Sequence, residues 1–349
     1  MRWITASICV AALLASGQVL ATGGISGRGE TGGKGGPGPG STAGGAGLGS
    51  SGSVGLGANP TDPDADLPGR AKPRTKPWEV EGIWETHRLV RSNDLGGYAV
   101  NKTVNVAFVY ARYDFTKYDR IWLRGGAYDR FIADETESGF RLDDVVGAYS
   151  RLIPLPEKLN LRLTAQASAP TSFIRQKEGL ITEGRLTAGL DRKFGRFFLN
   201  LRTFGGAHLM RYSTAQGGNA NPLASWATTL GAEYQIPYIE ALYLGAMVGN
   251  EYVWYYNTAD AGTVTSQQYG AVQDPNFPHQ PVQQSYGAEI YLRYVAPELV
   301  GIRSDLSIAY AQGDPSLGYT SALHDGVRHF YPVFWRQTSE VYVALTATY

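Results

Sequence analysis

The chain is poor in three features that often define a protein's class: cysteine, an excess of one charge sign, and long apolar runs. Cys9 is the only cysteine among 349 residues, which excludes a disulfide framework or a cysteine-based metal centre. The 31 basic and 31 acidic side chains balance, so no basic excess points to nucleic acid. After the first 21 residues, no stretch offers the roughly 18 consecutive apolar residues of a membrane helix.

The first 21 residues have the organisation of a secretory signal peptide. Arg2 gives the positive start, residues 8–15 form the apolar core, and residues 19–21 (Val-Leu-Ala) form a cleavage site. We therefore expect an exported protein whose mature chain begins at Thr22. Cleavage would also remove Cys9, which leaves the mature chain without cysteine.

Residues 22–76 contain 18 glycines and 6 prolines and almost no large apolar side chains. Such a segment cannot bury enough surface to offset the entropy of ordering it. We expect a disordered tail that acts as a spacer, as a tether for a periplasmic protein, or as a plug.

From Trp78 onward, apolar and polar residues alternate in segments of about 10 to 16 residues. The clearest is 159–168, where Leu159, Leu161 and Leu163 share one face and Asn160 and Arg162 the other. Period two of this kind predicts β-strands with one apolar face. Twelve strands fit, over 78–90, 102–115, 119–132, 142–153, 159–168, 179–191, 197–212, 223–236, 242–256, 284–295, 302–312 and 336–349.

The connections between these segments alternate between short and long. Short ones are expected at 116–118, 154–158, 192–196, 237–241 and 296–301; longer ones at 91–101, 133–141, 169–178, 213–222, 257–283 and 313–335. Transmembrane β-barrels have short periplasmic turns and longer outer loops. Residues 77–349 are therefore predicted to form an all-β, antiparallel up-and-down barrel of about twelve strands, with the tail and Tyr349 in the periplasm.

This pattern resembles that of bacterial outer-membrane β-barrel proteins, although no specific family within them is identified. Aromatic residues at expected strand ends, such as Trp226 and Trp254 on one side and Trp122 and Tyr294 on the other, are typical of interfacial girdles. The last strand alternates up to a terminal aromatic, like the segment that the barrel-assembly machinery recognises. The resemblance implies lipid contact and an assembly signal for five residues: Val341, Val343, Leu345, Ala347 and Tyr349.

Charged side chains on the polar faces are expected to point into the barrel, because charge on the lipid side is costly. The predicted lumen-lining set is Arg162, Glu183, Arg185, Arg202, His208, Glu233, Glu251, Glu289, Arg293, Asp305 and Glu340. These side chains either pair and fill the interior or line a water-filled path. Twelve strands lie between the filled eight-stranded barrels and the open barrels of sixteen or more, so strand number leaves both open.

The sequence offers no catalytic or metal-binding constellation. His208 and Ser213 are close in sequence, but strand alternation places them on opposite faces, and a nucleophile needs an adjacent base. His324 and His329 have only a weak metal-ligand spacing. We predict no cofactor, metal or enzymatic activity, and a channel or export conduit for polar solutes or polymer. The alternatives are a non-conducting component of an envelope-spanning complex, recruited through the tail, and, less favoured, an outer-membrane enzyme.

Overall fold

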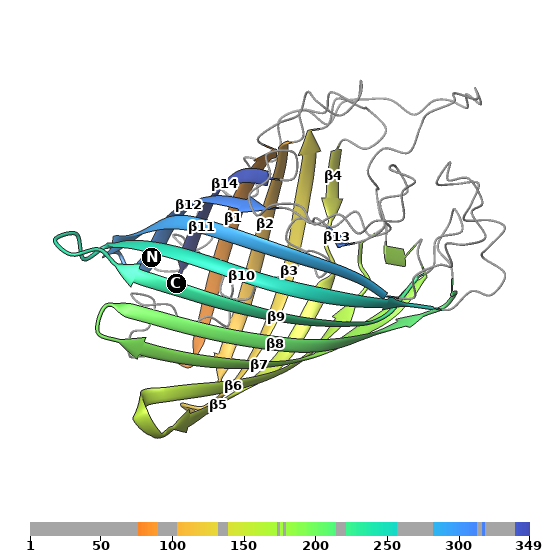
Figure 1. The fold of residues 1–349 in the computed structure, drawn as a ribbon, viewed down its shortest axis with the longest axis horizontal. Coiled ribbons are helices and arrows are strands. Elements are labelled where there is room, and N and C mark those ends of the chain that lie inside the picture. The colour runs from red at the N-terminus through yellow and green to blue at the C-terminus, as the bar shows by residue number, and fades with distance from the viewer. Residues whose placement is uncertain are drawn as a thin grey trace. The chain divides into compact units, whose positions relative to one another are not determined.

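The computed structural model is an all-β protein whose strands curve around into a barrel (Figure 1). It describes residues 76–89, 103–131, 139–172, 175–176, 179–213, 221–256, 282–312, 316–317 and 339–349. The strands are β1 (Trp78–Leu89), β2 (Thr103–Asp114), β3 (Asp119–Phe131), β4 (Gly139–Leu142), β5 (Val145–Leu155), β6 (Leu159–Ala169), β7 (Leu180–Phe194), β8 (Phe197–Met210), β9 (Pro222–Gln235), β10 (Leu242–Tyr255), β11 (Val282–Leu299), β12 (Ile302–Gln312), β13 (Ser316–Leu317) and β14 (Ser339–Thr348).

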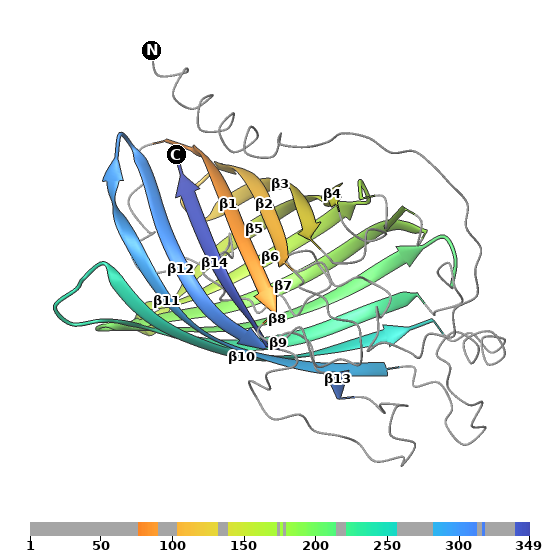
Figure 2. The same ribbon diagram turned by 90° about the horizontal axis from the view of Figure 1, so that it is seen from above.

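Neighbouring strands are antiparallel, and the barrel follows the order of the sequence. In the part of the chain that the structure describes, twelve strands form the ring, and the short strands β4 and β13 pair beside it with β3 and β11. β1 pairs with β14, which closes the sheet (Figure 2). The predicted antiparallel, up-and-down barrel of twelve strands is thus confirmed.

The ends of several strands differ from the predicted ends. The fourth predicted strand, 142–153, is split into β4 and β5 at Asp143 and Asp144. β11 continues past Pro297 to Leu299, where the register with β12 shifts. Proline cannot donate to a ladder but is tolerated at a bulge, so the turn shrinks to Val300 and Gly301 instead of starting at residue 296.

Three of the tight turns, β5–β6, β7–β8 and β9–β10, lie at one end of the barrel, and the C-terminus lies at that same end (Figure 1). Gly195 in the β7–β8 turn and Gly301 in the β11–β12 turn both have positive φ, which glycine adopts without strain. The β5–β6 turn is a 3-10 turn over Pro156–Lys158. We call this end the short-turn mouth.

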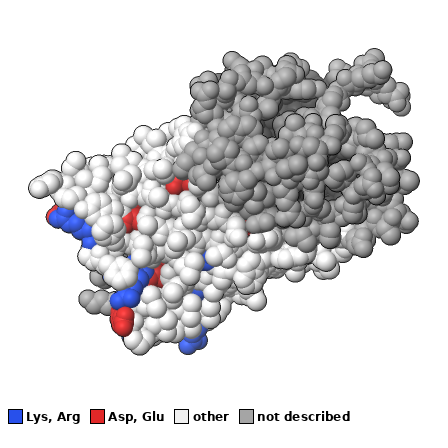
Figure 3. Space-filling model, in the orientation of Figure 1, with Lys and Arg blue, Asp and Glu red and all other residues white. Residues whose placement is uncertain are grey.

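The outward face of the wall is apolar. Leu230 in β9 lies directly opposite Leu201 in β8 and Val248 in β10, and all three side chains are exposed. Large parts of the wall in Figure 3 carry no charge, and most of the charged atoms visible there lie toward the short-turn mouth. An apolar band of this kind matches the lipid-facing surface of a transmembrane barrel. No helix among the described residues is both long and apolar enough to cross a bilayer.

Leu230→Arg should lower the free energy of unfolding in lipid vesicles by about 2–4 kcal/mol, the cost of arginine at the centre of a lipid-facing wall. Urea titration followed by the electrophoretic mobility of the folded barrel measures this loss. Ile239→Arg is the matched control, because Ile239 is 51% exposed, close to the 52% of Leu230, but lies in the β9–β10 turn. Equal losses in the two variants would contradict the membrane-facing assignment of Leu230.

Candidate functional site on the inner face of the barrel

Among the described residues, the inner face carries most of the buried charged side chains. Strand alternation turns every second residue inward, and in β1 this sets Glu79, Glu81, Glu85 and His87 on the buried face around Ile83. The same alternation buries nine residues of the predicted lumen set, namely Arg162, Glu183, Arg202, His208, Glu233, Glu251, Glu289, Arg293 and Asp305. Arg185 is half-buried, and the side chain of Glu340 lies outside the described part. Whether these residues line a water-filled path remains a prediction.

The most deeply buried of the ion pairs described here joins Arg293 in β11 to Glu233 in β9, reaching across β10. Arg293 Nε lies 2.8 Å from Glu233 Oε1, and Nη2 lies 2.7 Å from Oε2. Both side chains are almost fully buried, and the guanidinium carbon lies 4.7 Å from the centre of the Tyr243 ring. Two parallel charge-assisted hydrogen bonds fix the geometry of the pair.

Gly245 leaves space for the ring of Tyr291, two residues before Arg293 in β11. It lies opposite Tyr291 in the β10–β11 register, and a Cβ on Gly245 would fall 2.0 Å from Cζ of Tyr291. The tyrosine ring therefore lies against the backbone of β10. Gly126 has the same relation to Phe108, whose ring carbon Cδ1 would be 2.5 Å from such a Cβ.

A second ionic network lies where the first and last strands meet, and the sequence pattern did not reveal it. Arg112 in β2 binds Glu79 at 2.6 Å and Glu81 at 2.6 and 3.1 Å. Arg303 in β12 binds Glu79 at 2.7 Å, and the Thr348 hydroxyl donates to Glu81 at 3.1 Å. The network thus connects β1 and β2 with β12 and β14 on the inner side of the closing seam.

A third group lies toward the other end of the seam. The Glu85 carboxylate lies 2.9 Å from Nε2 of His87, and the His87 ring stacks on Tyr342 with centroids 4.7 Å apart. The Tyr342 hydroxyl donates to Glu289 at 2.7 Å. Glu85 and His87 made the first strand look irregular in sequence, yet both occupy its regular inward positions.

Two further sets of contacts lie within β7 and β8 and between the segment after β6 and the break between β4 and β5. Glu183 lies 3.0 Å from Arg185 and 3.8 Å from Nδ1 of His208. Arg175 lies 3.9 Å from Asp144, and the Ser172 amide donates to the same carboxylate at 2.9 Å. The break between β4 and β5 therefore anchors the start of the segment that follows β6.

The break also supplies a carboxylate to β3, since Arg124 donates to Asp143 at 3.1 Å. In the sequence, only the adjacent Asp143 and Asp144 near the start of the predicted strand 142–153 pointed to this pair. Also on the inner wall, Asn200 in β8 donates to Asp191 in β7. The Arg202 side chain lies over Gly189. A Cβ atom added to Gly189 would be 3.5 Å from both Cγ and Nε of Arg202.

Charge is distributed unevenly around the inner wall. The strands β9 to β12 carry four buried carboxylates, Glu233, Glu251, Glu289 and Asp305, against the buried Arg293 and the half-buried Arg303. The strands β6 to β8 instead carry three arginines, Arg162, Arg185 and Arg202, with Glu183 and Asp191. A polar solute inside the barrel would face an acidic arc beside an arginine-rich one.

The inner wall over β1 to β5 is apolar in its middle. Ile83, Val106, Phe108, Tyr110, Trp122, Tyr128 and Val146 form one buried cluster. Trp122 was expected among the interfacial aromatic residues, and this expectation is wrong, because it is 7% exposed and belongs to this cluster. Its side chain points inward, as do those of Arg120 and Arg124 two residues before and after it in β3. Trp226, by contrast, is exposed on the outer face.

The described residues contain no group of three or more histidine, cysteine, aspartate or glutamate side chains placed to hold a metal ion. His208 is buried on the inner face with Glu183 as its neighbour. His279, His324 and His329 lie outside the described part, as do the predicted signal peptide and residues 22–75.

The C-terminal strand places its predicted assembly signal on the outer face. Val341 and Leu345 are exposed, whereas the intervening Tyr342 and Ala344 are buried. Tyr349 exchanges backbone hydrogen bonds with Val80 at 2.9 and 3.1 Å. The recognition of this strand by an assembly machinery stays a prediction.

Solved structures share this architecture at low sequence identity. An outer membrane channel from Pseudomonas putida F1 matches with a TM-score of 0.50 and 10% identity, over 82% of this chain and 100% of the other. The fold is that of an outer-membrane β-barrel. The NanC porin (TM-score 0.41, 10% identity, 78% of this chain and 98% of the other) and OprD of Pseudomonas aeruginosa (0.35, 9%, 78% and 66%) are more distant. No family model and no curated protein sequence matches the chain.

Proposed function

We propose that this outer-membrane barrel is a channel for small polar solutes. The observation that carries the proposal is the inner wall itself, which bears buried charges of both signs while the outer wall is apolar. A barrel that only needed a stable interior could fill it with apolar side chains, since burying ion pairs contributes little net stability. The retained polar groups are those that a path for polar solutes requires.

The size of the inward side chains supports the same proposal. Along β9 and β12 many inward positions hold small residues, among them Ala227, Gly231, Ser307 and Ala309. Twelve strands enclose a wider interior than eight, and small residues do not fill it from the wall. The fold shared with an outer membrane channel from Pseudomonas putida F1 agrees with this proposal.

The proposal includes an orientation. Outer-membrane barrels turn their short connections toward the periplasm, so the short-turn mouth with Tyr349 and Lys76 would face the periplasm. The wall would contact outer-membrane lipid, and the C-terminal strand would be presented to the barrel-assembly machinery. The polar inner wall serves transport without an enzymatic step.

Single-channel recording of the full chain in planar bilayers tests the function. We expect discrete, reproducible conductance steps in potassium chloride from protein whose folding is shown by its electrophoretic mobility. Folded protein that stays silent over a range of voltages would overturn the channel proposal. That outcome would favour a non-conducting component of an envelope-spanning complex, and co-purification through residues 22–76 would then be the next measurement.

A further inference from the structure

Two neighbouring turns of the short-turn mouth end in exposed apolar side chains. In the β9–β10 turn, Tyr238 and Ile239 are 101% and 51% exposed. At the β11–β12 turn, Leu299 and Val300 are 74% and 78% exposed. The two turns lie next to each other, because β10 pairs with β11. We call these four side chains the apolar tips.

The backbone of the β11–β12 turn makes an apolar residue costly there. Val300 and Gly301 have φ angles of +53° and +79°, and Leu299 pairs with Ile302 across them, which is the pattern of a two-residue type I′ turn. Such turns prefer Asn-Gly, and a β-branched residue at positive φ is an outlier. Tyr238 also has a positive φ, +73°. The turns thus expose apolar side chains where the backbone favours glycine or asparagine.

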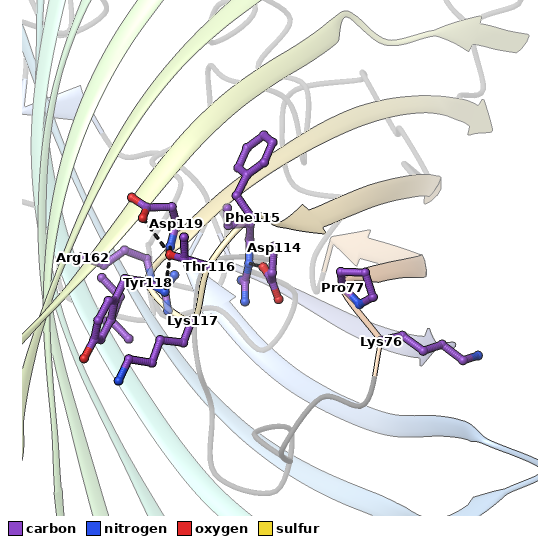
Figure 4. A pocket seen from close by; sticks show the side chains of 11 residues that line it. Lys76, Pro77, Asp114, Phe115, Thr116, Lys117, Tyr118, Asp119 and Arg162 are labelled. Atoms are coloured by element: carbon purple, nitrogen blue, oxygen red, sulfur yellow. Dashed lines mark hydrogen bonds and ion pairs between the residues drawn. The ribbon is translucent and has the colours of Figure 1, made fainter.

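The tips of the other three short turns carry charge instead. Exposed charged side chains lie in the β2–β3 turn (Lys117), the β5–β6 turn (Glu157) and the β7–β8 turn (Arg196). Figure 4 shows Lys117 extending from its turn, where the Thr116 hydroxyl accepts two backbone hydrogen bonds at 3.0 Å. The apolar tips therefore belong to one side of the mouth, that of β9 to β12, and are not a general property of its turns.

The apolar tips continue the outward face of the wall. Leu242, Tyr294 and Leu306 are register partners on β10, β11 and β12 close to these turns. Tyr294 and Leu306 are exposed on the outer face, and the Leu242 amide donates to the Ile239 carbonyl at 2.9 Å. Exposed apolar patches mark sites of protein or membrane contact. Continuity with the apolar wall favours the membrane for this patch.

We propose that the apolar tips insert into the headgroup layer of the lipid leaflet at the short-turn mouth, whereas the charged tips stay in water. Tyrosine is typical of this layer, and apolar side chains bind at its boundary with the acyl chains. Glu240 and Glu298 beside the tips are exposed, and carboxylates near an interface cost little. The barrel is thereby anchored more deeply on its β9–β12 side than on its β2–β8 side.

The insertion is compatible with the use of Ile239→Arg as the control for Leu230→Arg. The cost of arginine on the outer face of a barrel is highest at the midplane of the bilayer and small near the interfaces. Ile239 in the headgroup layer therefore still tolerates the charge that Leu230 in the wall does not.

Depth-dependent quenching of a fluorescent label tests the insertion. The full chain with Cys9→Ser has no cysteine, so Tyr238→Cys, Val300→Cys and the matched control Arg196→Cys can each carry one nitrobenzoxadiazole label. In nanodiscs of phosphatidylethanolamine and phosphatidylglycerol, a nitroxide on the lipid headgroup should quench the labels at positions 238 and 300 roughly threefold more strongly than the label at position 196. Aqueous iodide, which reaches both faces of a nanodisc, should quench in the opposite order.

A second variant separates insertion from folding. Leu299→Ser together with Val300→Asn removes the apolar tip of the β11–β12 turn and gives this turn its preferred Asn-Gly sequence, so the barrel should fold at least as well. The headgroup nitroxide should then quench the label at position 238 less strongly, because the neighbouring turn no longer inserts. Unchanged quenching at position 238 would contradict joint insertion of the two turns.

Two further results would overturn the proposal. If iodide reaches the labels at positions 238 and 300 as readily as the label at position 196, the apolar tips lie in water, and a periplasmic protein is the partner that they fit. If the headgroup nitroxide quenches all three labels equally, the whole mouth lies in the headgroup layer and the apolar tips have no separate role. Because no current is measured, the result is independent of whether the barrel conducts.

Discussion

Arg293→Met should lower the free energy of unfolding of the barrel by about 3–5 kcal/mol, the usual cost of leaving one partner of a buried ion pair without the other. Glu233 is almost fully buried, and Arg293 makes both of the side-chain hydrogen bonds described above to its two oxygens. Without the guanidinium, its carboxylate stays in a poorly solvated place or must take up a proton. Urea titration in lipid vesicles measures the loss.

Two comparison variants separate this effect from a general loss of charge. Arg192→Met removes an ion pair whose side chains are 34% and 72% exposed, and exposed pairs contribute at most about 1 kcal/mol. Replacing both partners, with Arg293→Met and Glu233→Leu together, should recover most of the stability, because no unpaired charge remains. If the double variant is as unstable as Arg293→Met alone, the desolvated carboxylate is not the cause.

Gly245→Ala should lower the stability of the barrel by about 1–3 kcal/mol, as expected for overpacking. The new methyl group would overlap the Tyr291 ring, with carbon–carbon distances of 2.0 to 2.5 Å. To relieve the overlap, the ring must leave the backbone of β10 and move into the interior. The same urea titration measures the change.

Gly184→Ala is the control for this substitution, since nothing lies within 4 Å of a Cβ at Gly184, and its stability should be unchanged. A double-mutant cycle with Tyr291→Ala tests the cause. In that background Gly245→Ala should cost little, because the ring it collides with is gone. An undiminished cost would mean that the backbone conformation of β10, and not Tyr291, requires the glycine.

The number and order of strands could be predicted because alternation is a local property. In β6, Leu159 to Ala167 follow period two without interruption, and the structure has a strand there. The ends of the strands were harder to predict, because a strand can continue for as long as its neighbouring strand pairs with it. β11 passes Pro297 through a bulge, and no pattern in β11 alone reveals that β12 still accompanies it.

The partners of the buried charges could not be predicted for a related reason. Arg293 and Glu233 are 60 residues apart and lie on strands separated by β10, so their contact depends on the register of two strand pairs. Arg112 and the glutamates of β1 were missed because the alternation in β1 mixes Ile83 with charged residues on one face. A polar face interrupted by one apolar residue looks irregular in sequence but is regular in space.

The closing seam has a consequence for how the chain reaches its folded state. Thr348 and Glu81, 267 residues apart, meet on the two strands whose pairing removes the last free edges of the sheet. Until the final strand is in place, β1 and β12 each expose a row of unpaired backbone groups, which invite pairing with other chains. Contacts so distant in sequence also form slowly. The unpaired edges must therefore be kept from other chains until every residue from β1 to β14 has been made and the barrel has closed.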